Sequence, residues 1–218
     1  MCIFADWNNS SINMKKFILI AAALFVGTLA QAQITANGGY IHATESFKSS
    51  VVSNSSPLDG FYAGANYYYS LDRFVDGLAV LPGLNLSFLW GSRTMLANTN
   101  YTNIKLSEVA LNIPVYASYT YKINENFKVF GQTGPSFQFA FSHRASTPQA
   151  SYQLLNRSNG LDLVRSVFNL YWGIGAGVEV SELLRLDVGY DFGFFNMSRT
   201  DGVSIRRGYL HFGVGYLF

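Results

Sequence analysis

Cysteine is almost absent from this sequence, since the only one is Cys2, close to the start of the chain. Without a second cysteine, no disulfide within the chain and no cysteine-rich metal site can form. Charged residues are also scarce, at 13%, whereas a soluble domain usually has about a quarter. The formal net charge of +2 is too small to indicate a nucleic-acid partner. These shortages argue against a disulfide-stapled domain, a nucleic-acid-binding protein and an ordinary soluble domain.

The start of the chain predicts export. Two lysines follow Met14 and precede the apolar run 17–29, which is too short to span a membrane as a helix. Ala30 and Ala32 then complete the small-x-small pattern that a signal peptidase cleaves. A basic segment, an apolar segment and a cleavage site in this order are typical of a secretory signal peptide.

Three segments follow from this pattern. We expect residues 1–13 to be an extension upstream of the true start, residues 14–32 to be the signal peptide, and residues 33–218 to be the exported domain. The alternative is an N-terminal membrane anchor, which the short apolar run disfavours. Removal of the leader would leave an exported chain without cysteine.

The exported part predicts β-strands throughout. No stretch sustains the 3.6-residue period of a helix, while aromatic and β-branched residues recur between turn signals. Each candidate strand reaches the nine to eleven residues, roughly, that a strand tilted across a bilayer needs. The eight candidates are residues 34–44, 60–71, 78–91, 105–123, 127–143, 167–181, 184–198 and 207–218.

The connections between these strands predict a membrane barrel. Short connections follow the second, fourth and sixth strands, and long ones follow the others. Bacterial outer-membrane barrels alternate in this way, with short periplasmic turns and long extracellular loops. We therefore expect an all-β fold, an eight-stranded antiparallel up-and-down transmembrane β-barrel in the bacterial outer membrane, with both termini in the periplasm. The long loops are expected at residues 45–59, 92–104, 144–166 and 199–206.

The two faces of each strand differ. In the last strand, Phe212, Val214, Tyr216 and Phe218 alternate with small or polar residues, which is the period of a strand. A soluble lipocalin-like barrel would turn the apolar face inward, and a membrane barrel would turn it to lipid. An eight-stranded barrel has room inside only for side chains, too little for all the Phe, Trp, Tyr and Leu of these faces. The apolar faces are therefore expected to contact lipid.

Charged residues agree with this assignment, because none of the exported chain falls on the predicted lipid face. A charge there at mid-depth would cost roughly 2–4 kcal/mol. The predicted lumen network consists of Glu108, Lys122, Lys128, Glu179, Arg185, Asp187 and Asp191. The predicted loop charges are mostly basic: Lys48, Arg93, Lys105, Arg144, Arg157, Arg165, Arg199, Arg206 and Arg207, against Glu45, Asp59, Asp162 and Asp201.

Aromatic residues are expected to form a girdle at each membrane interface, where amphipathic rings are favoured. On the side of the short turns the candidates are Tyr67, Tyr69, Tyr119, Tyr121, Tyr216 and Phe218. On the side of the loops they are Phe88, Trp90, Phe139, Phe141, Phe168 and Phe194.

A family resemblance rests on several segments. The terminal residues Phe212, Val214, Tyr216 and Phe218 resemble the signal that the outer-membrane barrel assembly machinery recognises. The most specific stretch runs from "LNIPVYASYTY" to "FKVFGQTGPSF", and "GIGAGVEVSELLRLDVGYDFG" and "GYLHFGVGYLF" follow it. Together they are similar to the Bacteroidota outer-membrane β-barrel family, described as porin-like or PorT-like, with the architecture of small OmpA- or OmpX-type barrels. The resemblance covers nearly all of residues 34–218 and implies location and architecture rather than an activity.

Three functions remain open. The first is a closed barrel with a structural or surface-interaction role through four extracellular loops. The second is a narrow pore for small solutes or ions, for which the inward glycines would leave space. The third is a barrel enzyme using His143 and Ser146 near the third loop or His211 in the lumen, but these residues make no recognisable catalytic motif. We therefore expect no enzymatic activity.

The expected partners follow from the location. They are outer-membrane lipid and lipopolysaccharide, whose phosphates would lie beside the basic loops, and the barrel assembly machinery during biogenesis. The three scattered histidines have no metal-ligand spacing, so neither a metal nor a cofactor is expected. We expect a monomer, no nucleic-acid partner, and a loop ligand whose identity the sequence leaves open.

Overall fold

The computed structural model describes residues 33–49, 53–97, 100–147, 150–156 and 164–218. The predicted upstream extension and signal peptide, with Ala30 and Ala32, lie outside these residues. No helix in the described ranges is long and apolar enough to cross a membrane.

The described residues form strands joined by turns and loops. Eight strands are long, and β6 is a short strand within the third long connection. The bounds are β1 Gln33–Lys48, β2 Ser53–Ser70, β3 Leu78–Ala97, β4 Asn100–Asn124, β5 Phe127–Ser146, β6 Ser151–Gln153, β7 Phe168–Val180, β8 Leu184–Gly193 and β9 Ser204–Leu217.

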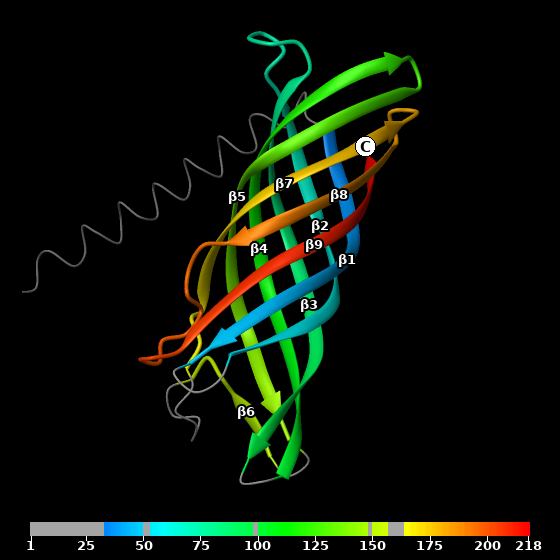
Figure 1. Ribbon diagram of the computed structural model, residues 1–218. Coiled ribbons are helices and arrows are strands. Elements are labelled where there is room, and N and C mark those ends of the chain that lie inside the picture. Colours follow the sequence, from blue (N-terminus) through cyan, green and yellow to red (C-terminus); the bar gives the residue numbers. More distant parts are fainter. Residues whose placement is uncertain (1–32, 50–52, 98–99, 148–149, 157–163) are drawn as a thin grey trace, which may run out of the picture. The chain divides into compact units, whose positions relative to one another are not determined.

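The long strands close into a ring in chain order. Each of them is hydrogen-bonded to the strand before and after it, and β9 returns to pair antiparallel with β1. In that closing pair Tyr40 lies opposite Phe212, and Figure 1 shows the two strands side by side. Closure pairs the backbone groups that a sheet edge would leave free, which is what a strand in lipid requires. The predicted eight-stranded antiparallel barrel is confirmed.

The two ends of the barrel differ. The β2–β3, β4–β5 and β7–β8 connections lie at the same end as the C-terminus (Figure 1), and we call this the turn end. The β7–β8 turn places Ser181 and Glu182 at φ angles of 54° and 57°, the left-handed pair typical of a tight hairpin. The opposite end, with the β1–β2, β3–β4, β5–β7 and β8–β9 connections, is the loop end.

Two of the predicted long loops are wrong. Strands β1 and β2 extend until only residues 49–52 separate them, and β3 and β4 until only residues 98–99 do. The β3–β4 ladder continues to the pair Ala97 and Asn100. Cross-strand pairing satisfies the backbone groups better than an open loop, so the strands continue as hairpins beyond the expected boundary. The third and fourth connections remain long.

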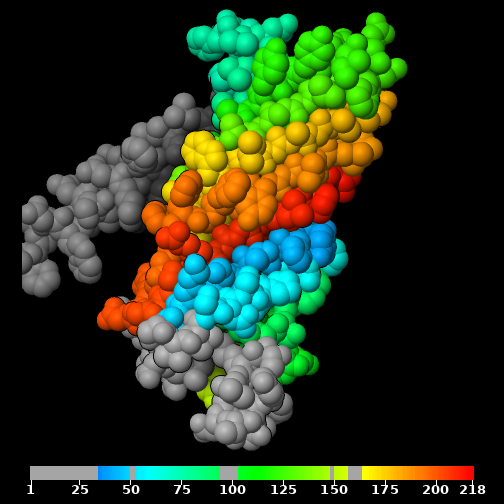
Figure 2. Space-filling view, in the orientation of Figure 1, coloured from blue at the N-terminus to red at the C-terminus, as the bar shows by residue number. Residues whose placement is uncertain are grey.

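The alternation of faces is confirmed. On the outer face Trp90, Ile174 and Phe212 are each about half exposed, whereas inward residues such as Ala43 and Tyr171 are almost completely buried. Figure 2 shows this outer face over β7, β8, β9 and β1. Phe195 lies beyond the end of β8 and is exposed beside Phe168.

A bulge in β5 changes which alternate residues face the lumen in the loop-end half of the strand. Ser142 pairs with Val109 and Ala140 with Ala110, so Phe141 has no residue opposite it. As a result His143, rather than Ser142, is buried inside the barrel.

Candidate functional site: the closed lumen

Six ionisable side chains are buried together inside the loop end of the barrel. Each is between 1% and 6% exposed. Five strands and one connection supply them, and we call the group the loop-end cluster. Its members are Glu45 of β1, Arg93 of β3, Glu108 of β4, His143 of β5, Arg207 of β9, and Arg165, which precedes β7.

Five members of the cluster form a closed cycle of hydrogen bonds, and the sixth, Arg93, donates to Glu45 at 3.4 Å (Nη2–Oε1). Arg207 donates to Glu45 at 2.7 Å (Nη2–Oε2) and to Glu108 at 2.6 Å (Nη1–Oε1). His143 Nδ1 lies 2.6 Å from Glu108 Oε2, and His143 Nε2 lies 2.8 Å from Arg165 Nη1. Arg165 donates in turn to Glu45 at 2.6 Å (Nη2–Oε2), which completes the cycle. Each buried carboxylate is thus paired, as burial of a charge requires.

This geometry determines the tautomer of His143. Arginine has donors and no acceptor, so His143 Nε2 must accept from Arg165. Nδ1 then carries the proton and donates it to Glu108. A neutral His143, three arginines and two glutamates leave the cluster with one net positive charge.

Residues from two long connections complete the cluster. The backbone N–H of Leu154 donates to His143 O, and that of Arg165 to Leu154 O. The β8–β9 connection contributes Met197, which is 2% exposed and accepts a weak hydrogen bond from Arg165 at 3.7 Å. Leu58, from β2, belongs to the same buried core as Leu154. The described parts of these connections therefore fold into the mouth of the barrel.

A layer of neutral polar side chains lies beneath the loop-end cluster. Gln138 Nε2 donates to Tyr209 Oη at 2.6 Å and to Asn112 Oδ1 at 3.0 Å. Asn112 donates onward to Ser87, and the Tyr171 hydroxyl donates to Tyr209 at 3.1 Å. The tyrosine rings lie 4.7 Å apart, so this layer fills the cross-section with hydrogen-bonded groups.

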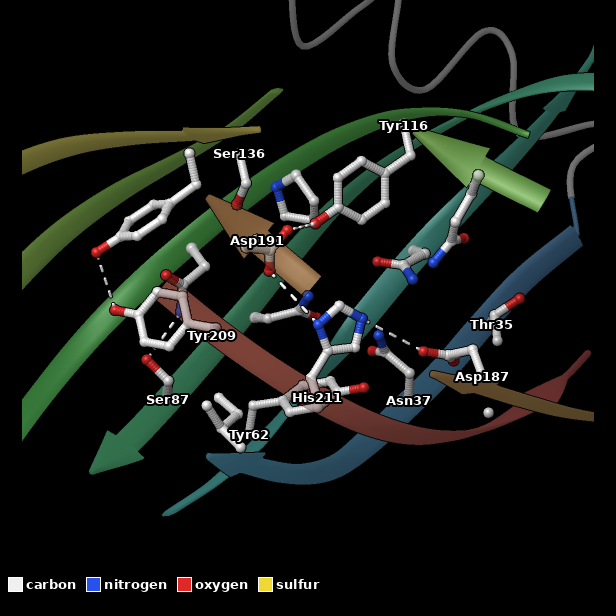
Figure 3. Close-up of a pocket in the computed structure, with 18 of the residues that line it drawn as sticks. Thr35, Asn37, Tyr62, Ser87, Tyr116, Ser136, Asp187, Asp191, Tyr209 and His211 are labelled. Atoms are coloured by element: carbon white, nitrogen blue, oxygen red, sulfur yellow. Dashed lines mark hydrogen bonds and ion pairs between the residues drawn. The ribbon is translucent and has the colours of Figure 1, made fainter. Parts of the chain in front are cut away.

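A cavity of about 80 Å³ lies further toward the turn end (Figure 3). His211 lies between its two carboxylates, 3.6 Å from Asp187 and 3.5 Å from Asp191. Tyr116 donates to Asp191 at 2.9 Å. A water molecule needs at least about 10–15 Å³, so there is room for several waters but not for a ligand of several hundred Å³.

The inward glycines around this cavity are covered by aromatic rings. A Cβ added to Gly173 would lie 2.8 Å from the Tyr116 hydroxyl, and one added to Gly39 would lie 2.7 Å from the Tyr62 ring. The space beside these two glycines is therefore occupied by large side chains from facing strands.

The turn end has its own closure. Arg185 donates to Glu179 at 2.7 Å and to Gln132 at 3.2 Å. Its guanidinium lies 3.4 Å from the centroid of the Phe130 ring, a cation–π contact.

The structure divides the predicted lumen network into three groups. Glu108 belongs to the loop-end cluster, Asp187 and Asp191 line the cavity, and Glu179 pairs with Arg185. The remaining two do not join them. Lys122 is exposed at the turn end, and Lys128 pairs with Glu182 of the β7–β8 turn at 2.9 Å.

Four predicted loop charges are wrong, because Glu45, Arg93, Arg165 and Arg207 are buried in the lumen. For three of them the sequence contained a signal. Glu45 lies two residues after the inward Ala43, so the strand alternation turns it inward as well. Arg93 and Arg207 likewise occupy alternate positions that face inward in β3 and β9. Arg165 precedes its strand and follows no period, so only the fold reveals its position.

Asp59 corrects a second expectation, that no charge lies on the outer face. It lies on that face opposite Trp90, near the loop end. His42 Nδ1 is 2.7 Å from its carboxylate, and the Tyr40 hydroxyl donates to it. Hydrogen bonds from two partners reduce the cost of a carboxylate beside aromatic residues.

The catalytic alternative finds no support in the positions of its residues. His143 is buried in the lumen and paired with Glu108, whereas Ser146 lies on the outer face after the β5 bulge. Within the described ranges, no group of three or more His, Cys, Asp or Glu residues is placed to hold a metal ion.

The fold and the filled lumen define a small outer-membrane β-barrel, and comparison with known families agrees. The chain belongs to the outer membrane protein beta-barrel domain family, whose model matches residues 22–199. The protein is therefore located in the outer membrane. No curated protein sequence matches the chain.

The solved structures similar to this chain include the following three. Neisserial surface protein A is 16% identical with a TM-score of 0.44, over 86% of this chain and 97% of its own. OprG from Pseudomonas aeruginosa is 11% identical with a TM-score of 0.42, over 86% and 96%. The outer membrane protease OmpT from Escherichia coli is 10% identical with a TM-score of 0.42, over 88% and 98%. These similarities assign neither an activity nor a ligand to this chain.

Proposed function

We propose that the protein is a closed, non-conducting outer-membrane barrel with a structural or surface-interaction role carried by its loop-end connections. The observation that supports this most is the loop-end cluster. Its cycle of ion pairs links β1, β4, β5 and β9 to Arg165 of the third connection, and each member is buried. A lumen filled at this level has no continuous aqueous path, and the ordered connections form a stable surface for contact with other molecules.

A narrow pore is the alternative. The cavity with Asp187, Asp191 and His211 is the feature that favours it, because carboxylates would attract cations. The hydrogen-bonded layer on one side and the Arg185–Glu179 pair on the other argue against it. An enzymatic activity is not part of the proposal, since His143 and Ser146 lie on opposite faces of β5.

The partners remain predictions from the sequence. Phe212, Val214, Tyr216 and Phe218 all face outward near the turn end, where a membrane-embedded assembly factor can contact them. The narrower resemblance to PorT-like proteins of Bacteroidota and the monomeric state are likewise proposals. The third connection, whose described part includes β6, is the best candidate for contact with a partner.

Single-channel conductance tests the proposal. The protein would be expressed from the full chain, purified from outer membranes and reconstituted into a planar bilayer, with folding verified by the gel shift of unboiled samples. A silent membrane containing folded protein supports the closed barrel. Reproducible conductance steps contradict it, and steps that change in Asp187→Asn but not in Asp201→Asn would locate the path in the lumen, because Asp201 is exposed in a loop.

A further inference from the structure

The outer face of the loop end has two matched groups of basic and hydroxyl side chains. Because Arg93, Arg165 and Arg207 are buried, fewer basic residues are exposed at the loop end than the sequence predicts. Four of these lie on barrel strands near the loop end rather than in loops, and they occur in two pairs.

The first group lies on β4 and β5. Lys105 is opposite Ser146, and Ser107 is opposite Arg144. All four face outward, because their neighbours Leu106, Glu108, His143 and Ala145 are buried inside. Lys105 and Arg144 are therefore diagonal neighbours on one face, within reach of a shared ligand for such long side chains. We call these four residues the β4–β5 basic site.

The second group repeats this arrangement on β1 and β9. Lys48 is opposite Ser204, and Ser46 is opposite Arg206. Burial of Glu45, Ile205 and Arg207 shows that these four residues face outward. This β1–β9 basic site lies on the other side of the ring, with β2 and β3 between the two sites in one direction and β7 and β8 in the other.

No described carboxylate forms an ion pair with any of these four basic side chains. Two cations on one face of a strand pair repel each other unless an anion lies between them. Serine hydroxyls opposite each cation add donors that match a tetrahedral oxyanion. The arrangement is that of a phosphate site.

The surroundings indicate the source of the phosphate. Trp90 lies directly opposite Ser107 of the β4–β5 basic site, and Val109 and Phe141 are the next outward residues toward the turn end. Trp90 and Phe141 are exposed, as expected for rings at a membrane interface. A cationic site directly beyond such a girdle lies at the level of lipid headgroups.

We propose that the β4–β5 and β1–β9 basic sites each bind a phosphate group of a lipid in the outer leaflet. The lysine and arginine donate charge-assisted hydrogen bonds to the phosphate, the two serines orient it, and the acyl chains lie along the apolar outer face. The proposal is independent of whether the lumen conducts.

Native mass spectrometry of the detergent-solubilised full protein tests this, with lipid A bearing two phosphates as the probe. Enzymatically dephosphorylated lipid A and inorganic phosphate serve as comparisons. The variants are Lys105→Gln with Arg144→Gln, and Lys48→Gln with Arg206→Gln. The matched control is Arg199→Gln with Arg73→Gln, which removes two exposed charges outside both sites.

We expect the phosphorylated lipid to bind at least about tenfold more tightly than the dephosphorylated one, because one hydrogen bond to a charged group changes the affinity by about this factor. Each site variant should lose about tenfold in affinity for one equivalent of lipid, and the control should lose none. Equal binding of both lipids would overturn the proposal, as would an equal loss in the control. Complete competition by millimolar inorganic phosphate would show a free-anion site instead of a lipid site. Gel shifts of unboiled samples confirm that each variant is folded.

Discussion

The loop-end and turn-end halves of the lumen differ in how their polar side chains are paired. In the loop-end half two arginines, two glutamates and a histidine form a continuous buried cycle, and a third arginine, Arg93, donates to Glu45. In the turn-end half one pair, Arg185 with Glu179, lies beyond a cavity. The amide oxygens of Asn37, Asn66 and Asn85, which line that cavity, have no hydrogen-bond partner among the described residues. Each carboxylate of the loop-end half is thus paired with an arginine or a histidine, whereas three amide oxygens around the cavity have no such partner, and we expect the loop-end half to contribute more to stability.

The largest expected effect is that of Arg207→Ala. This substitution leaves Glu45 and Glu108 without their shared partner in a fully buried position. Breaking a buried ion pair typically costs about 3–5 kcal/mol. The free energy of unfolding, measured by urea titration in lipid vesicles, should fall by this amount, whereas Arg199→Ala, in an exposed loop position, should change it little. A loss no larger than in the control would show that the cluster does not stabilise the barrel.

Arg185→Ala is the matching test in the turn-end half. It removes one ion pair and the contact with Phe130. We expect a loss of about 2 kcal/mol, typical of hydrogen bonds to a charged group that water can partly replace. The same urea titration checks this, and a loss equal to or larger than that of Arg207→Ala would contradict the comparison between the halves.

Two asparagines sharpen the comparison further. Asn112 donates to Ser87 and accepts from Gln138, so Asn112→Leu should destabilise the barrel by about 1–2 kcal/mol. Asn85 lines the cavity with an unpartnered oxygen, so the near-isosteric Asn85→Leu should be neutral or slightly stabilising. The midpoint of the gel shift on heating unboiled samples measures both. Equal losses in the two variants would show that the cavity wall is as fully hydrogen-bonded as the layer above it.

Lys128→Met should have the smallest effect. Lys128 pairs with Glu182 at the turn end, and this pair lowers the pKa of the exposed Glu182 carboxyl. A lowered carboxyl pKa gives stability that is present above the ordinary glutamate range and is lost as the pH falls through the lowered value. Solvent screens such a pair, so no measurable change is expected at neutral pH. A clear fall in the free energy of unfolding at pH 7 would show that the Lys128–Glu182 pair at the turn end stabilises the barrel.

Sequence patterns predicted the strands and faces well because a strand is a local structure. The alternation around Phe212 or Trp172 needs only neighbouring residues, and their outward positions are confirmed. Strand ends were less predictable. The pattern weakens near residues 45 and 92, where polar residues face inward, so it predicts strands that end too early and places Glu45 in a loop. The β5 bulge at Phe141 has no sequence signal, so the position of His143 in the lumen could not be predicted from the strand period.

The sequence by itself therefore determined an exported chain of long amphipathic strands with an apolar lipid face, since period-two alternation and low charge are properties of the chain alone. The tertiary structure decided how the lumen is filled. Four distant parts of the chain supply Glu45, Glu108, Arg165 and Arg207. Only ring closure and register bring each of these carboxylates within 2.7 Å of an arginine. Register also places lysine, arginine and serine together on the outer face, because pairing between strands depends on the whole barrel and not on either strand alone.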